Sequence, residues 1–344
     1  METMIGISWA LLAALFLGTF ALPAKYVKNY AWENTWGAFF FIGMLVVPVG
    51  FAMLTVKDLW ATYAEVSPGV LAAVVGLGFL WGCGFCSWGK GLAMVGLSLG
   101  YSLTMGTMAL VGSMLPFFLG HAEKAGTVGG MTVIAGILVC IVGVGINGFA
   151  GILRERAERA TSKGMEKKTM ALGLFVCVLA GVLSSACNIA YHVGGSVGQI
   201  DTISAQQFGN PPWLVGLSVW TLIFLGGFLS SVGFSTFMLF RNGTWSGFLQ
   251  EGSARNVGLA TLMAIGHFAC LFFYGVGAWK LGALGTSVGF AVFQSGSLLV
   301  GNGLGAMTGE WRNAGAASKR TLCAGLAVLI AGIAIVALGN ALAE

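Results

Sequence analysis

The feature that most constrains this chain is a series of long apolar stretches. A helix needs about 20 apolar residues to cross the hydrocarbon core of a bilayer, and the sequence contains ten segments of roughly this length. Only 8% of the residues are charged, whereas a water-soluble domain carries about 25%. The sequence therefore predicts an all-α membrane protein with ten transmembrane helices. The expected spans are 5–24, 36–55, 69–89, 96–119, 128–149, 170–193, 213–240, 257–279, 284–306 and 321–340.

Basic residues are distributed unequally between the two ends of these spans. In a ten-span topology one side carries 14 of the 17 lysines and arginines, and the other carries only Lys57, Lys124 and Lys280. Basic residues near span ends are retained in the cytoplasm, so both chain termini are predicted to lie outside. The first span lacks a basic flank and a cleavage site, so we expect a retained helix and not a signal peptide. No basic face with interleaved aromatic residues indicates nucleic-acid binding.

A polar stretch divides the expected spans into two groups of five. Residues 151–168, GILRERAERATSKGMEKK, are rich in charges spaced four residues apart, which is typical of a solvated linker. The chain is therefore predicted to contain a first five-helix repeat over 1–150, a cytoplasmic linker over 151–168 and a second five-helix repeat over 169–344.

The two halves share an internal repeat. Gly-x-Ser-x-Gly occurs as GLSLG at 96–100 and as GTSVG at 285–289, and a shift of 189 residues aligns 96–120 with 285–309. The identical pairs are Gly96/Gly285, Ser98/Ser287, Gly100/Gly289, Leu110/Leu299, Val111/Val300, Gly112/Gly301, Leu115/Leu304 and Gly120/Gly309. Because the segments are the fourth and ninth spans, they cross the membrane in opposite directions. Inverted repeats of this kind are typical of secondary transporters, whose site lies between the repeats and opens alternately to each side.

The same pattern also occurs in the nucleophile elbow of serine hydrolases, so an intramembrane enzyme is an alternative. An elbow needs a histidine base and an acid partner, but none of the three histidines lies near both serines in the sequence. Small residues four positions apart instead favour close helix packing in lipid. The expected packing residues are Gly96, Ser98, Gly100, Gly285, Ser287 and Gly289.

Other catalytic and cofactor patterns are weak. Cys83 and Cys86 form Cys-x-x-Cys inside an apolar span, without a helix N-terminus or a basic neighbour to activate a thiol. The sequence has no cluster of histidines, cysteines and carboxylates for a metal and no Walker loop for ATP. We expect neither a cofactor nor a metal site.

His267 and Gln294 are polar side chains expected near the bilayer centre. His267 lies twelve residues after Arg255 and thirteen before Lys280, and an imidazole titrates near neutral pH. It is a candidate proton or substrate site, with a neutral bond to a neighbouring helix as the alternative. Gln294 can both donate to and accept from sugar hydroxyls, although bonding between helices explains it equally well.

Four further candidates lie on other spans. Asn188 and Tyr191 share a face of the sixth span near its outer end, where simple anchoring at the membrane interface is the alternative. Tyr274 and Trp88 offer flat apolar faces suited to sugar C–H groups. Aromatic side chains in such spans also commonly face the lipid or the core.

No acidic residue is expected at mid-membrane. Six of the twelve fall on each side, and the nearest candidates for proton coupling are Glu33, just before the second span, and Glu310, just after the ninth. Interfacial ion pairs are the alternative for both. A site without fixed charge favours a neutral substrate.

Three stretches resemble a known family. KYVKNYAWENTW (25–36), WGKGLAMVGLSLG (88–100) and EWRNAG (310–315) are similar to segments of the bacterial L-rhamnose/proton symporter family of the drug/metabolite transporter superfamily. The resemblance covers nearly the whole chain, including its length, ten spans and basic central loop. It implies uptake of L-rhamnose, a 6-deoxyhexose, with a proton across the bacterial inner membrane.

We therefore expect a multi-pass inner-membrane protein with periplasmic termini that imports a small neutral sugar, with L-rhamnose as the leading candidate, by proton-coupled alternating access. The expected partners are this sugar, protons and the lipid bilayer. The expected substrate ligands are Gln294, His267, Tyr274, Asn188, Tyr191 and Trp88, and the proton-coupling candidates are His267, Glu33 and Glu310. Uptake of another neutral sugar and export of amphipathic metabolites are the alternatives within transport.

Overall fold

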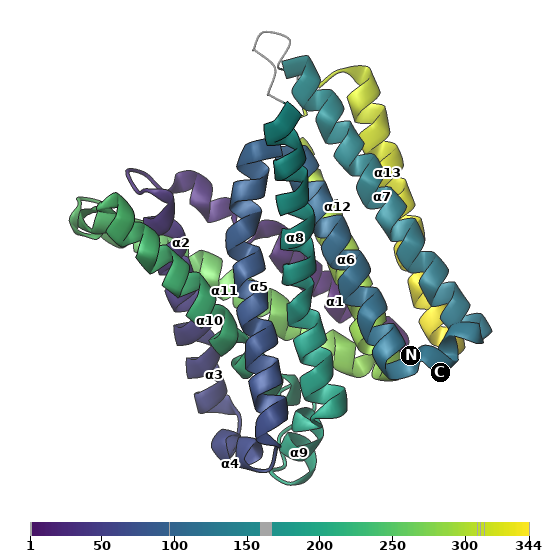
Figure 1. Cartoon of the computed structure of the whole chain (residues 1–344). Helices are drawn as coiled ribbons and strands as arrows, with labels where there is room; N and C mark the ends of the chain where they lie inside the picture. The colour runs from purple at the N-terminus through teal and green to yellow at the C-terminus, as the bar shows by residue number, and fades with distance from the viewer. Residues whose placement is uncertain are drawn as a thin grey trace.

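The computed structural model of the chain describes residues 2–95, 97–158, 167–307, 309, 311–312 and 314–343. All regular elements among these residues are helical, and ten segments are long and apolar enough to cross a membrane. Each of the ten overlaps one predicted span, so the prediction of an all-α chain with ten spans is confirmed. Both chain ends lie at one end of the bundle, and the end of α7 (Val128–Glu158) and the start of α8 (Lys167–His192) lie at the other (Figure 1).

The other elements follow the chain in two series. In the first half they are α1 (Glu2–Thr19), η1 (Leu22–Tyr26), α2 (Trp32–Phe41), η2 (Ile42–Val46), α3 (Val47–Thr55), α4 (Leu59–Ala64), α5 (Pro68–Val95), α6 (Leu97–His121) and η3 (Ala122–Gly126). In the second half they are η4 (Val193–Val197), α9 (Ile200–Gln206), α10 (Val215–Asn242), η5 (Thr244–Leu249), α11 (Ser253–Lys280), η6 (Gly282–Leu284), α12 (Gly285–Met307) and α13 (Ala316–Ala343).

The second span consists of α2, η2 and α3. The segment η2 is a short π-helix, and Pro48 follows it at the start of α3. Proline has no N–H to donate to the preceding turn, and its ring crowds the carbonyl four residues earlier. A widened turn accommodates both effects, so the span continues from Trp32 to Thr55 without a break.

Two boundaries differ from the expected positions. The sequence places the junction of the third and fourth spans near Gly91, but α5 continues to Val95. Gly91 of α5 is buried against α8, where a methyl group in its place would lie 2.7 Å from the sulfur of Cys177. The extra turn is retained because it packs against this neighbour. In addition, α7 extends to Glu158, so the predicted linker begins as a helical continuation of the fifth span.

A row of glycines joins α7 to α13, which lie side by side in Figure 1. The glycines recur every seven residues on each helix, at Gly129, Gly136 and Gly143 and at Gly325, Gly332 and Gly339. A methyl group at Gly136 would lie 2.6 Å from the backbone nitrogen of Val336 on α13. The two backbones therefore approach more closely than any larger side chain would allow, which is how helices attract one another in lipid.

The remaining long helices surround the centre of the molecule. Here α5 packs along α8, α11 packs along α1, and α6 and α12 contact each other between these two pairs. The helix α10 lies outside this group, against α5 and α2. This arrangement brings six helices, α1, α5, α6, α8, α11 and α12, to one central cavity.

Candidate substrate cavity

The central cavity has a volume of about 70 Å³ and mostly apolar walls. Aromatic rings form much of this surface, including those of Phe20, Trp81, Phe85 and Phe293. Besides the indole groups of Trp81 and Trp88, the polar side chains among the lining residues are Tyr101, Thr104, Ser184, His267 and Gln294. None of the described lining residues carries a fixed charge. The cavity therefore suits a small neutral molecule with both an apolar and a polar surface.

A wider vestibule of about 290 Å³ adjoins the cavity. The residues that line both spaces are Leu17, Phe20, Trp88 and Tyr101, so the two spaces share a wall. The vestibule also contacts Lys25 and Arg154, and Arg154 belongs to the end of α7, which lies opposite the chain termini (Figure 1). The guanidinium of Arg154 lies over the ring of Trp311, 4.9 Å from its centre. A larger space with basic lining residues therefore lies next to the cavity on this side.

Three buried polar atoms beside the cavity have no hydrogen-bond partner among the described residues. They are Trp88 Nε1, His267 Nδ1 and Gln294 Oε1. Leaving such an atom buried and unpaired costs about 1–3 kcal/mol, so a ligand that pairs with it recovers free energy. The indole nitrogen only donates, the amide oxygen only accepts, and the imidazole nitrogen does either according to its tautomer. A molecule with several hydroxyl groups can satisfy all three.

Aromatic rings enclose His267 on several sides. The ring of Trp81 stacks nearly parallel to the imidazole with a centre-to-centre distance of 5.8 Å, and Phe20 and Phe39 lie at 5.2 and 5.4 Å. The side chain is 2% exposed. These rings fix the orientation of the imidazole at the cavity wall, where its Nδ1 atom is left for a ligand or a water molecule.

Asn188 and Tyr274 bond to each other below the cavity. The Tyr274 hydroxyl donates to Asn188 Oδ1, and Asn188 Nδ2 donates to the carbonyl oxygens of Gly112 and Thr286 at 2.7 and 2.8 Å. The ring of Tyr274 stacks on Phe293, which lines the cavity, with 5.2 Å between ring centres. Both predicted ligands thus lie directly behind the cavity wall and do not line it in this conformation.

Tyr191 lies one turn further along α8. Its hydroxyl donates to the carbonyl oxygen of Gly275 at 3.3 Å, and its ring stacks on Trp220 with 5.0 Å between centres. It lines a second vestibule at the opposite end of the cavity. The six predicted substrate ligands therefore divide into three that line the cavity (Trp88, His267 and Gln294) and three that lie behind its wall (Asn188, Tyr191 and Tyr274).

Glu33, one of the acidic candidates, is placed away from the cavity. It is 4% exposed in the first turn of α2, and its Oε1 atom accepts hydrogen bonds from Asn242 Nδ2 and Thr244 Oγ1, both at 2.8 Å. Its carboxylate thus ties α2 to the connection after α10. Glu310, the other candidate, lies outside the described residues.

The second copy of the Gly-x-Ser-x-Gly pattern packs against the end of α11. A methyl group at Gly285 would collide with the carbonyl of Ala278, and one at Gly289 would lie 3.3 Å from the side chain of Leu281. Ser287 is 1% exposed. In the first copy, Gly100 is buried on α6, whereas Gly96 and the side chain of Ser98 lie outside the described residues.

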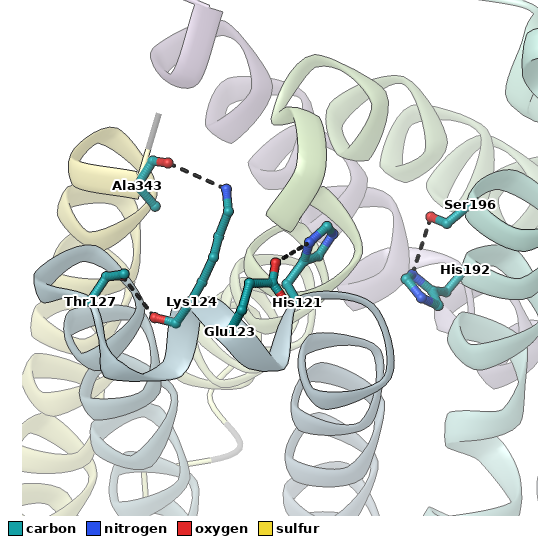
Figure 2. Close-up of polar contacts among 7 residues, drawn as sticks. All are labelled: His121, Glu123, Lys124, Thr127, His192, Ser196 and Ala343. Atoms are coloured by element: carbon teal, nitrogen blue, oxygen red, sulfur yellow. Dashed lines mark hydrogen bonds and ion pairs between the residues drawn. The ribbon is translucent and has the colours of Figure 1, made fainter.

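The second vestibule, which we call the outer vestibule, lies at the end of the bundle that holds the chain termini. It has a volume of about 760 Å³, and His121, His192 and Asp201 are among its lining residues. Figure 2 shows polar groups at this end: His121 Nδ1 lies 3.7 Å from Glu123 Oε1, and His192 Nδ1 lies 3.4 Å from Ser196 Oγ. Burial raises the pKa of the Asp201 carboxyl above its usual range.

Three polar lining residues were missed in the sequence. Tyr101 and Thr104 lie three residues apart on α6, with Met108 four further on, so all three face the cavity along one stripe of the helix. Ser184 lies four residues before Asn188 on α8. Spacing on a helix face was therefore the available indication, but the sequence does not say which face of a membrane helix points inward.

Ten segments long and apolar enough to span a membrane, a central cavity whose described lining residues are uncharged, and a vestibule toward each end are typical of a secondary transporter. The chain belongs to the family of L-rhamnose-proton symport proteins, whose family model matches residues 1–342. The resemblance found in the sequence is thereby confirmed, and the family is one of transporters and not of enzymes.

Individual relatives match this chain over nearly its whole length. The chain is 28% identical to the L-rhamnose-proton symporters of Salmonella dublin and of Citrobacter koseri, over 98% of this chain and 98% of each relative. A solved crystal structure matches with a TM-score of 0.53 and 14% identity over 96% of both chains. At this identity the last match shows a shared fold alone.

Proposed function

We propose that the protein imports L-rhamnose together with a proton. The observation that carries this proposal is the cavity in which Trp88 Nε1, His267 Nδ1 and Gln294 Oε1 are unpaired beside aromatic walls. Sugar hydroxyls pair with such atoms, and the C–H face of a sugar packs on aromatic rings. The names of the relatives, L-rhamnose-proton symporters, support this 6-deoxyhexose as the sugar.

The lining of the cavity supports a neutral substrate over a charged one. The described lining residues include neither carboxylates nor lysines or arginines. A charged ligand would enter without a counter-charge, which is costly in an apolar surrounding. An uncharged sugar loses only its water hydrogen bonds, and the unpaired atoms replace part of them.

We assign proton coupling first to His267. Imidazole is the side chain that normally changes charge between pH 5 and 8, and this one lies at the cavity wall. Once protonated, it would be stabilised by the aromatic faces of Phe20 and Trp81 through cation–π attraction. Glu33 and Glu310 remain the acidic candidates, with Glu33 engaged by two hydrogen-bond donors.

We further propose that the halves 1–150 and 169–344 are inverted repeats. If the two halves are repeats, α5, the third span of the first half, corresponds to α11, the third span of the second half. Likewise α1 and α8 correspond, because each is the first span of its half. The contact of α11 with α1 therefore matches the contact of α5 with α8. In the same way α6 corresponds to α12, and the contact of α12 with α1 matches the contact of α6 with α8. An inverted repeat requires such paired contacts, with the substrate site between the halves.

The same proposal places the protein in the bacterial inner membrane with its termini in the periplasm. The cavity then opens through the vestibule of Lys25 and Arg154 to the cytoplasm, so this conformation faces inward. Asn188, Tyr191 and Tyr274 contact the sugar in the opposite conformation, when their present partners have separated.

The test is uptake of labelled L-rhamnose by proteoliposomes that contain the full chain. With an acidic exterior we expect accumulation above the external concentration, and a protonophore should abolish it. The variant His267→Gln keeps a polar group but cannot titrate, so it should exchange sugar across the membrane without accumulating it. Accumulation of other neutral sugars but not of L-rhamnose would show that another sugar is the substrate. Efflux of amphipathic compounds without any sugar transport would refute the proposal.

A further inference from the structure

The two ends of the cavity differ at positions that the internal repeat matches. Gly112 on α6 corresponds to Gly301 on α12. A methyl group at Gly112 would collide with the ring of Phe290, whereas one at Gly301 would meet nothing within 4 Å. Likewise, a methyl group at Gly120 would lie 2.8 Å from an imidazole carbon on α8, and one at the matching Gly309 would meet nothing within 4 Å. Packing is therefore closed toward the outer vestibule and open toward the basic end.

One side chain joins four helices at the closed end. Asn188 on α8 bonds to Gly112 on α6, to Tyr274 on α11 and to Thr286 on α12. Both amide hydrogens donate, the amide oxygen accepts, and the residue is 0% exposed. The side chain of Thr286 continues the connection, because its Oγ1 atom lies 3.2 Å from His192 Nδ1.

The Asn188 side chain lies between the central cavity and the outer vestibule. On α8, Ser184 and Cys187 line the central cavity, whereas Tyr191 and His192 line the outer vestibule. Asn188 falls between the two pairs. Four residues of α-helix advance about 6 Å, so the barrier along this helix is about one turn thick. A barrier so thin is opened by separating the few groups that bond across it.

We propose that Asn188 is a positioning residue of the transport cycle, a latch whose three hydrogen bonds hold α6, α11 and α12 together and close the cavity to the outer side. The inference rests on the proposed function, since it assigns this latch to alternating access. Hydrogen bonds in a buried site are costly to break unless the groups find new partners. Sugar hydroxyls and water arriving from the outer side supply such partners, so opening makes the Asn188 amide a ligand.

The native Cys187 allows a direct test, because it lines the cavity next to the latch and forms no disulfide. The other six cysteines are replaced by alanine in the full chain, and an impermeant thiol reagent is applied to vesicles from either side. Tyr274→Phe removes one bond of the latch and Asn188→Ala removes all three. Tyr63→Phe is the matched control, because its buried hydroxyl bonds to Ser218 O at 2.7 Å, away from the latch.

We expect labelling of Cys187 from the terminus-bearing side to rise about fivefold in Tyr274→Phe, which corresponds to one hydrogen bond, and more in Asn188→Ala. Labelling from the basic side should fall or stay constant, and the control should match the parent. Unchanged labelling from the terminus-bearing side in both variants, or an equal rise from both sides, would overturn the latch. The assay uses no sugar, so a failure of L-rhamnose uptake leaves its outcome independent.

Discussion

The buried amide of Gln294 is better explained by ligand binding than by a structural role. Its side chain is 1% exposed, its Oε1 atom is unpaired, and its Nε2 atom has only the sulfur of Met108 at 3.5 Å. A structural glutamine would be bonded to a neighbouring helix, as Asn188 is. The amide therefore costs stability while it is unpaired and gains its partners when a hydroxyl-bearing molecule enters.

Replacing Gln294 with leucine should separate function from stability. Gln294→Leu removes one to two hydrogen bonds to the sugar, so we expect the KM for L-rhamnose uptake to rise about five- to thirtyfold. The melting temperature in detergent should stay constant or increase, because an unpaired polar group leaves an apolar site. Gln206→Leu, on the exposed surface of α9, is the control and should change neither quantity. A lower melting temperature with an unchanged KM would instead make Gln294 a packing residue.

At the scale of whole elements, α7 and α13 form a unit apart from the cavity. Neither the central cavity nor the outer vestibule has a described lining residue from them, although Asn147, Gly151 and Arg154 of α7 line the vestibule at the basic end. Their contact depends on glycines in register, which bring the two backbones close together beside the helices that surround the cavity.

Two alanine substitutions on α7 should have opposite effects. Gly136→Ala places a methyl group 2.6 Å from the backbone nitrogen of Val336, which cannot turn aside, so we expect a loss of about 1–3 kcal/mol in stability. Gly145→Ala faces open space on the same helix and should be neutral or stabilising by up to about 1 kcal/mol, from helix propensity alone. Thermal melting in detergent distinguishes them. Equal melting temperatures would show that the glycine contact does not hold the two helices together.

The whole molecule was easier to predict from the sequence than its site. A run of about 20 apolar residues is enough to indicate a membrane helix, so all ten spans were found without knowing any contact between them. The site depends on helix rotation, which is set by packing between distant segments. Glu33 illustrates the difference: its carboxylate is engaged by Asn242 and Thr244, more than 200 residues away, and sequence alone made it a proton-coupling candidate.

The same reason explains how the predicted ligands divided. His267 and Gln294 were chosen for their depth in the membrane, and both reach the cavity because polar side chains at that depth face away from lipid. Asn188 was chosen for a shared helix face near the outer end of its span and Tyr274 for its aromatic ring, and the two bond to each other in this conformation. Depth predicts that a polar group is inside the protein, whereas only contacts reveal whether it meets a cavity or another side chain.

Orientation in the membrane is the last property that belongs to the whole molecule. Moving a positive charge across an inside-negative membrane costs about 2.3 kcal/mol per 100 mV, which favours the topology with 14 basic residues inside and three outside. We expect an impermeant maleimide to label Lys57→Cys in intact bacterial cells, in a background without other cysteines, because this position is exposed at the terminus-bearing end. Arg241→Cys, exposed at the opposite end, should be labelled only after permeabilisation. The reverse pattern would invert the topology, and the open vestibule would then face the periplasm.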